Sequence, residues 1–161
     1  MKTPRDSAVT MTEIVLPSDT NALGTIFGGK VMAWIDIAAA TAAIRHSRKV
    51  MVTASIDALH FIAPVKLGDI LTIKASINYV GRTSCEIGVR VDSEDPTSGK
   101  ISHTASAYLT FVALDKKGKP AVIPSLKVET PEEKRRCEAA KRRRAGRLAL
   151  ANDLKSSNLK R

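Results

Sequence analysis

The segment from Lys30 to His46 constrains the fold of this chain more than any other feature of its sequence. Its apolar residues are Val31, Met32, Trp34, Ile35 and Ile37, and an alanine-rich run at 38–43 follows them. Alanine has the highest helix propensity, so the segment is predicted to be a helix. Because apolar positions surround most of this helix, we expect it to be buried, with the rest of the chain wrapped around it.

Four strand-like segments follow the predicted helix, each with apolar residues at alternate positions. They are Val50–Ala63, Ile70–Val80, Thr83–Asp92 and Ile101–Leu114, and turn residues separate them. A shorter alternating segment, 9–16, precedes the helix. Short connections favour antiparallel neighbours, so we predict an α+β fold in which one antiparallel sheet curls around the helix. Such a sheet has an edge strand that can pair with a second copy of the chain.

The positive charge of the chain is concentrated near its C-terminus. The chain has 26 Lys and Arg against 16 Asp and Glu, a net charge of +10, and 12 of the basic but only 5 of the acidic residues lie from Lys127 onward. Thr130, Pro131 and Glu133 form a capping box with proline at the first helical position. A helix to about residue 152 is therefore predicted. It has few apolar residues, so we expect it to pack weakly or not at all. The chain divides into a folded domain at 8–125 and a basic tail at 126–161, helical or partly disordered.

Composition and cysteine spacing exclude several classes of protein. Hydrophobic residues make up 43% of the chain, which is typical of globular proteins. The first ten residues, MKTPRDSAVT, lack the apolar run of a signal peptide. Cys85 and Cys137 are 52 positions apart with no CxxC pair, which argues against a disulfide framework and a structural zinc site. We expect a cytoplasmic protein that is neither secreted nor inserted in a membrane, and that holds no metal.

Asp36 is the first candidate for a functional residue. It lies midway along the predicted helix, beside Ile35 and Ile37. Burying an isolated carboxylate is costly, so Asp36 must have a partner or remain protonated. A structural aspartate bonded to the backbone or to an arginine is the alternative interpretation. The residues that precede the helix favour a functional role for Asp36 over this structural one.

The loop before the helix contains Asn21, Gly24 and the pair Gly28-Gly29. Free N–H groups at a helix start, with no side chains to block them, can hold an oxyanion or a polarised carbonyl. An aspartate two turns farther along can then serve as base or nucleophile. Taken alone, a glycine pair before a helix is common, and an asparagine in such a loop is more often a turn residue.

The histidines are weaker candidates than Asp36. His60 and His103 lie in predicted strands and His46 lies near a helix end, where packing or capping is the more common role. No two of them have metal-ligand spacing. The GxSxG elbow, the phosphate-binding loop and the dinucleotide fingerprint are also absent from the sequence. Serine-hydrolase, kinase and redox chemistry therefore have no support.

Taken together, these residues resemble a known family. The segment from Pro17 to Asp36, PSDTNALGTIFGGKVMAWID, is similar to the signature of hotdog-fold acyl-CoA thioesterases, which include bacterial acyl-CoA hydrolases and the mammalian brain acyl-CoA hydrolase. Further matches run in the expected order over roughly residues 8–125: VTASID at 52–57, GD at 68–69, GRTS at 81–84, SAYLTF at 106–111 and GKP at 118–120. The resemblance implies a hotdog fold, an antiparallel sheet wrapped around a long central helix. The tail lies outside it.

The resemblance implies hydrolysis of a fatty acyl-CoA to free fatty acid and CoA, a reaction of fatty acid metabolism. No separate cofactor is implied, because CoA is part of the substrate. In this family the active site forms across a dimer, so Asn21 of one subunit faces Asp36 of another. Asp36 then acts as general base or nucleophile, and Asn21 positions the water or the carbonyl. The amide groups of Gly28 and Gly29 stabilise the oxyanion.

The resemblance also implies an assembly and a place for CoA. Dimers form a homohexamer, a trimer of dimers, with CoA along the subunit interface. The residues implied to lie near the CoA nucleotide and phosphates are Gly81, Arg82, Thr83 and Ser84. Arg82 supplies charge there and the loop supplies backbone donors, although an ordinary hairpin turn is an equal alternative. Residues such as Met32 and Phe61 shape the acyl tunnel, and the sequence leaves the preferred chain length open.

Other functions are consistent with parts of the sequence. A hotdog hydratase or dehydratase needs a catalytic histidine near the helix, and no histidine is beside Asp36 in the sequence. A second alternative is an acyl-CoA-binding or regulatory module that does not hydrolyse its ligand, and the charge of the basic tail is the feature that supports it. Three interpretations of the tail are open, and we favour the first, a solvated extension. In the second the tail supplies positive charge near the CoA phosphates, and in the third it binds nucleic acid or anionic lipid electrostatically. Nucleic acid is disfavoured because no aromatic residue follows Phe111.

Overall fold

A computed structural model describes residues 1–57 and 59–158. Residue 58, inside a predicted strand, and residues 159–161, at the end of the predicted tail, lie outside the described residues. The elements in chain order are η1 (Pro4–Ser7), β1 (Val9–Ile14), η2 (Pro17–Asp19), α1 (Gly28–Ser47), β2 (Val50–Ile56), β3 (His60–Phe61), β4 (Ile70–Val80), β5 (Ser84–Glu94), β6 (Ile101–Leu114) and α2 (Pro131–Asn158).

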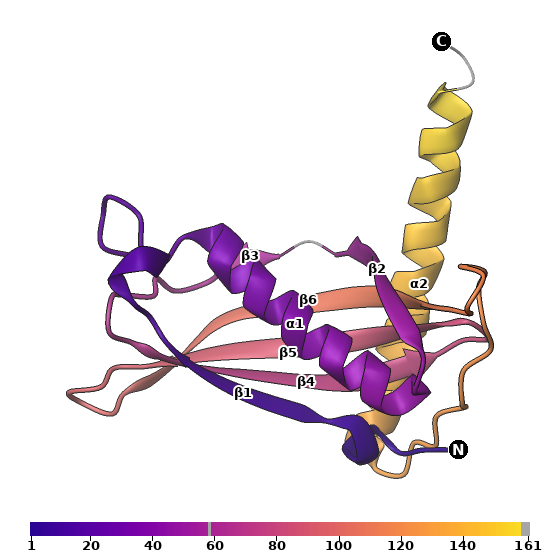
Figure 1. The fold of residues 1–161 in the computed structure, drawn as a ribbon, viewed down its shortest axis with the longest axis horizontal. Coiled ribbons are helices and arrows are strands. Elements are labelled where there is room, and N and C mark those ends of the chain that lie inside the picture. The colour runs from indigo at the N-terminus through magenta and orange to yellow at the C-terminus, as the bar shows by residue number, and fades with distance from the viewer. Residues whose placement is uncertain (58, 159–161) are drawn as a thin grey trace.

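The strands form one antiparallel sheet that curls around α1. Their order is β1–β4–β5–β6–β2, and β3 pairs with β6 beside β2. Helix α1 lies across one face of the sheet, and α2 crosses the opposite face before projecting beyond it (Figure 1). This is the predicted hotdog arrangement. Among the described residues, no helix is both long enough and apolar enough to span a bilayer.

Helix α1 begins two residues before its predicted start and is buried along one side only. Its alanines at 38, 39, 42 and 43 are fully buried against the sheet, as are Val31 and Ile35. The expectation that the whole helix is buried is wrong for a single chain, because Met32, Ile37 and Ile44 are 41–53% exposed. Ile37 and Ile44 lie on the side of α1 that the sheet does not cover, and Met32 lies near the start of the helix. The neighbouring edge strand β2 also exposes Val50 and Val52.

The predicted strand 50–63 is interrupted. Strand β2 ends at Ile56, and only His60 and Phe61 rejoin the sheet as β3. Within β2 the register against β6 shifts between Thr53 and Ser55, which is a β-bulge. Alternation of apolar residues does not reveal such a shift, so the sequence predicted one continuous strand.

Helix α2 begins at the predicted residue and packs on the sheet. Its capping box forms, since the Glu133 carboxylate accepts the Thr130 N–H at 3.0 Å and the Thr130 hydroxyl accepts the Glu133 N–H at 3.1 Å. The expectation of weak packing is wrong, because Arg143 reaches the buried carboxylate of Glu86 at 2.7 Å. The Arg143 guanidinium also lies 3.6 Å from the centre of the Tyr108 ring. Charge, rather than an apolar stripe, attaches this helix to the sheet.

Candidate active site

Asp36 lies two turns into α1, half-buried beside the edge of the sheet. The Thr53 hydroxyl on β2 donates a hydrogen bond of 2.8 Å to its Oδ1 atom. Among the described residues this is the only hydrogen bond to the Asp36 side chain, so Oδ2 can accept a proton or a ligand. The partner that a carboxylate in this helix requires is therefore Thr53. Sequence reasoning gave Thr53 no role, although it lies in the VTASID motif.

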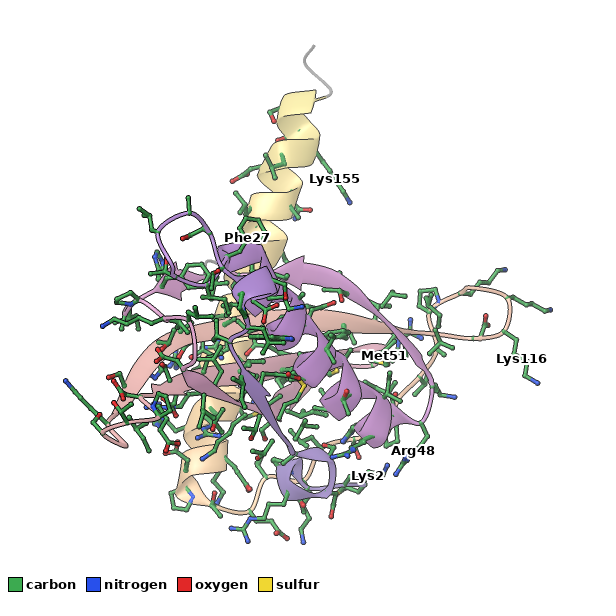
Figure 2. The ribbon with its side chains drawn as sticks, turned by 60° about the vertical axis from the view of Figure 1, so that its left-hand side comes forward. Lys2, Phe27, Arg48, Met51, Lys116 and Lys155 are labelled. Atoms are coloured by element: carbon green, nitrogen blue, oxygen red, sulfur yellow. The ribbon has the colours of Figure 1, made fainter. Side chains whose placement is uncertain are left out.

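Gly28 and Gly29 form the first turn of α1, as expected for an anion-binding helix start. The preceding Phe27 makes no side-chain capping bond, which leaves the first N–H groups of the helix available. A Cβ atom on Gly29 would lie 2.6 Å from Cε1 of Phe27, and one on Gly28 would lie 3.4 Å from the Phe61 ring. The two glycines thus keep the backbone close to two aromatic rings. Figure 2 shows Phe27 at the start of the helix.

Asn21 lies in the loop before α1, where its side chain bonds to its own loop. Its Oδ1 accepts the Leu23 N–H at 2.9 Å, and its Nδ2 donates to the Thr25 hydroxyl at 3.0 Å. These are the bonds of an Asx turn. Within the part of this single chain that the structure describes, no hydrogen bond joins Asn21 to Asp36. A role for Asn21 opposite the Asp36 of another subunit stays a prediction.

A buried aspartate fixes the same loop to the helix. Asp19 is 7% exposed, and its carboxylate accepts the Leu16 N–H at 2.9 Å and pairs with Lys30 Nζ at 3.3 Å. The Asp19 carbonyl also accepts the Phe27 N–H at 2.8 Å. These bonds hold the glycine pair in one position relative to Asn21. Sequence reasoning did not single out Asp19 or Lys30.

The turn at 81–84 joins β4 to β5. The Gly81 N–H donates to the Ser84 carbonyl at 2.8 Å, which closes the hairpin, and the Arg82 side chain is exposed to solvent. The Arg82 carbonyl also accepts the Ile123 N–H at 3.1 Å. An exposed arginine on a fixed turn is available to a phosphate. A role for these residues in CoA binding nevertheless stays a prediction.

His46 and His103 take no part in this constellation. His46 is fully buried and its Nε2 lies 2.8 Å from the Pro124 carbonyl. Burial lowers the pKa of His46, so its imidazole is neutral near pH 7. His103 contacts Ser106 and Asp92 on the opposite face of the sheet. Over residues 1–57 and 59–158, no cluster of three or more His, Cys, Asp or Glu could hold a metal ion.

Comparison with known proteins identifies the family. Residues 23–100 match the thioesterase superfamily. An uncharacterised acyl-CoA thioester hydrolase of Bacillus subtilis is 39% identical over 166 residues, which cover 96% of each chain. The chain belongs to the acyl-CoA thioester hydrolases.

Solved structures of other acyl-CoA thioester hydrolases share this fold. A hexameric acyl-CoA thioesterase is 43% identical, with a TM-score of 0.89 over 92% of this chain and 96% of that one. The acyl-CoA hydrolase of Staphylococcus aureus, solved with butyryl-CoA, CoA and CoA disulfide, is 38% identical, with a TM-score of 0.89 over 96% of this chain and 94% of that one. The hotdog fold and the thioesterase family implied by the sequence motifs are both confirmed.

Proposed function

We propose that this chain hydrolyses a fatty acyl-CoA to the free acid and CoA, with Asp36 as general base or nucleophile. The observation that carries the proposal is the contact between Asp36 Oδ1 and the Thr53 hydroxyl. It orients a half-buried carboxylate and leaves its second oxygen without a hydrogen bond to any described residue. The acyl-CoA ligand of the Staphylococcus aureus relative supports the substrate class. We expect this reaction in the cytoplasm, within fatty acid metabolism.

Two copies of the chain are needed to complete one site. Gly28 and Asp36 are eight residues apart in one helix, which is about 12 Å along its axis. A thioester carbonyl must lie within about 3 Å of both its oxyanion donor and the attacking group. Asp36 therefore acts with the glycine amide groups of the other subunit. A two-fold axis near Met32, midway between Gly28 and Asp36, makes the two helices antiparallel and places the start of one beside the middle of the other.

The surface for this pairing is the apolar side of α1 with the edge strand β2. Met32, Ile37 and Ile44 are exposed on the helix, and Val50 and Val52 are exposed on the strand. An exposed edge strand beside an apolar face is suited to pairing with a second copy. The relative described as hexameric supports assembly. We propose that three such dimers assemble into a hexamer.

In the proposed reaction, Asp36 removes a proton from water and the water oxygen attacks the thioester carbon. As a nucleophile, Asp36 instead attacks this carbon itself, the C–S bond breaks to give a mixed anhydride and the CoA thiolate, and water then hydrolyses the anhydride. The oxyanion forms against the Gly28 and Gly29 amide groups of the partner helix. Asn21 of that partner positions the water or the carbonyl. In the general-base route the C–S bond breaks after the attack, and the CoA thiolate takes up the proton that Asp36 removed from water. Arg82 and the turn at 81–84 hold the CoA phosphates.

The test is thiol release from acyl-CoA substrates, from acetyl to palmitoyl, by the wild type and by Asp36→Asn. Asparagine keeps the shape of the side chain and removes its charge. Asp153→Asn is the matched control, because Asp153 is exposed on the far part of α2. We expect hydrolysis by the wild type and the control, and a loss of about 10²-fold or more in kcat for Asp36→Asn. Wild-type protein that binds CoA but hydrolyses no substrate would instead be a binding module.

A further inference from the structure

A cavity lies on the face of the sheet opposite α1, away from Asp36. It has a volume of about 520 Å³, opens to solvent, and lies between strands of the sheet and the first half of α2. Lys74, Arg90 and Ser106 are register partners on β4, β5 and β6, so they form one row along this face. The volume falls within the range of about 300–1,000 Å³ that is usual for small-molecule sites.

The lining of this cavity is strongly basic. It includes Lys74 and Arg90 from the sheet and Arg135, Arg136 and Arg143 from α2, and none of the described residues that line it is Asp or Glu. The carboxylates that pair with the arginines, such as Glu132 and Asp92, lie outside the lining. Across the described residues, no carboxylate lies within ion-pair distance of Lys74.

The arginines retain donors for a ligand. Arg90 uses only its Nε atom for Asp92, at 3.0 Å, and Arg143 uses Nε and one terminal nitrogen for Glu86. A guanidinium has five N–H donors and binds phosphate oxygens in pairs. The hydroxyl of Thr10 adds a neutral donor to the same lining.

We propose that this cavity binds a polyphosphate anion. Its cations lie on two walls, the sheet and α2, so a ligand with two or more linked phosphates can contact both of them. Such a group occurs in free nucleoside triphosphates and in the nucleotide part of CoA. The bound anion joins α2 to the sheet, and it therefore protects the basic helix from trypsin.

Calorimetry on the full chain at 150 mM salt, with tripolyphosphate as the probe, tests the proposal. The variant Lys74→Gln/Arg136→Gln removes one cation from each wall. The control Lys116→Gln/Arg142→Gln removes the same charge from exposed positions outside the cavity. We expect the wild type and the control to bind, the cavity variant to bind about tenfold to a hundredfold more weakly, and tripolyphosphate to slow tryptic cleavage of α2. No binding by the wild type, or equal binding by both variants, would overturn the proposal.

Two further arms identify the source of the phosphates and separate this site from catalysis. The binding of ATP and of CoA is compared between the wild type and the cavity variant. Weaker ATP binding by the variant assigns the cavity to free nucleotides, and weaker CoA binding with unchanged ATP binding assigns it to CoA. The kcat of thioester hydrolysis, measured at saturating acyl-CoA, is expected to be the same for the cavity variant and the wild type, because both residues lie outside the Asp36 site. A failure of hydrolysis at Asp36 leaves the binding result unaffected.

Discussion

The hydroxyl of Thr53 donates a 2.8 Å hydrogen bond to the carboxylate of Asp36. This bond joins the middle of α1 to the edge strand of the sheet, beside a β-bulge in that strand. Because this bond holds Oδ1, it also fixes the direction in which Oδ2 points. The orientation of Asp36 is therefore set by β2 as well as by its own helix.

We expect Thr53→Val to lower kcat by about tenfold to a hundredfold, because it removes a hydrogen bond to a charged group and keeps the β-branched shape. Steady-state thiol release measures the effect. Thr12→Val, on the exposed side of β1, is the matched control and is expected to keep full activity. Equal kinetics for the two variants would show that the Thr53 hydroxyl has no role in orienting Asp36.

Ile37→Glu is expected to separate the subunits and abolish hydrolysis. Ile37 is 53% exposed in the single chain, on the apolar side of α1. A carboxylate at the proposed contact would be buried without a partner, which weakens association by about a hundredfold or more. Light scattering after size-exclusion chromatography measures the assembly. Ile101→Glu, at a position that is 67% exposed in another part of the chain, is the control and should leave assembly unchanged.

Glu86→Gln is expected to destabilise the fold by about 3 kcal/mol, because it removes a buried carboxylate that two half-buried arginines share. Glu86 is 1% exposed and pairs with both Arg143 and Arg147. Urea unfolding at fixed protein concentration measures the change. The control Glu132→Gln breaks an exposed ion pair with Arg136 on α2, the helix that carries Arg143 and Arg147. A comparable loss of unfolding free energy in that control would contradict a special role for the burial of Glu86.

Cys85 is expected to make stability fall at alkaline pH. Burial raises the pKa of its thiol from 9.0 to about 12. The folded chain therefore keeps the neutral thiol, and the resulting stability is complete below pH 9 and is lost as the pH rises from 9 towards 12. The free energy of unfolding of the wild type and Cys85→Ala, measured over this range, should show a steeper decline for the wild type. Parallel curves would mean that the thiol ionises equally in both states.

Most of the fold could be predicted from local patterns in the sequence. The alanine run of α1 and the alternation in β4 and β6 are signals within one element, so their bounds were close to those observed. The capping box likewise located the start of α2 at Pro131. The break after Ile56 could not be predicted, because it depends on the register between β2 and β6.

The candidate site was predictable only where its residues are close in sequence. The glycine pair and Asp36 lie on one helix, so a motif contains them together. Thr53 contacts Asp36 from another element, and alternation in its strand assigns it no role. Glu86 lies between apolar residues of β5, so alternation puts it on the polar side of the strand, but its burial depends on α2. Few apolar residues in α2 suggested weak packing, whereas arginine pairing with Glu86 attaches it to the sheet.

In the proposed site, Asp36 of one subunit acts with Asn21 and the glycine amide groups of another. Mixing two inactive variants tests this sharing most directly. Asp36→Asn and Asn21→Ala are each assayed alone, then unfolded and refolded together, and native mass spectrometry verifies the mixed dimers. Each mixed dimer holds one intact site, so an equal mixture is expected to regain about one quarter of wild-type activity. A mixture that contains mixed dimers and stays as inactive as its components would contradict the account.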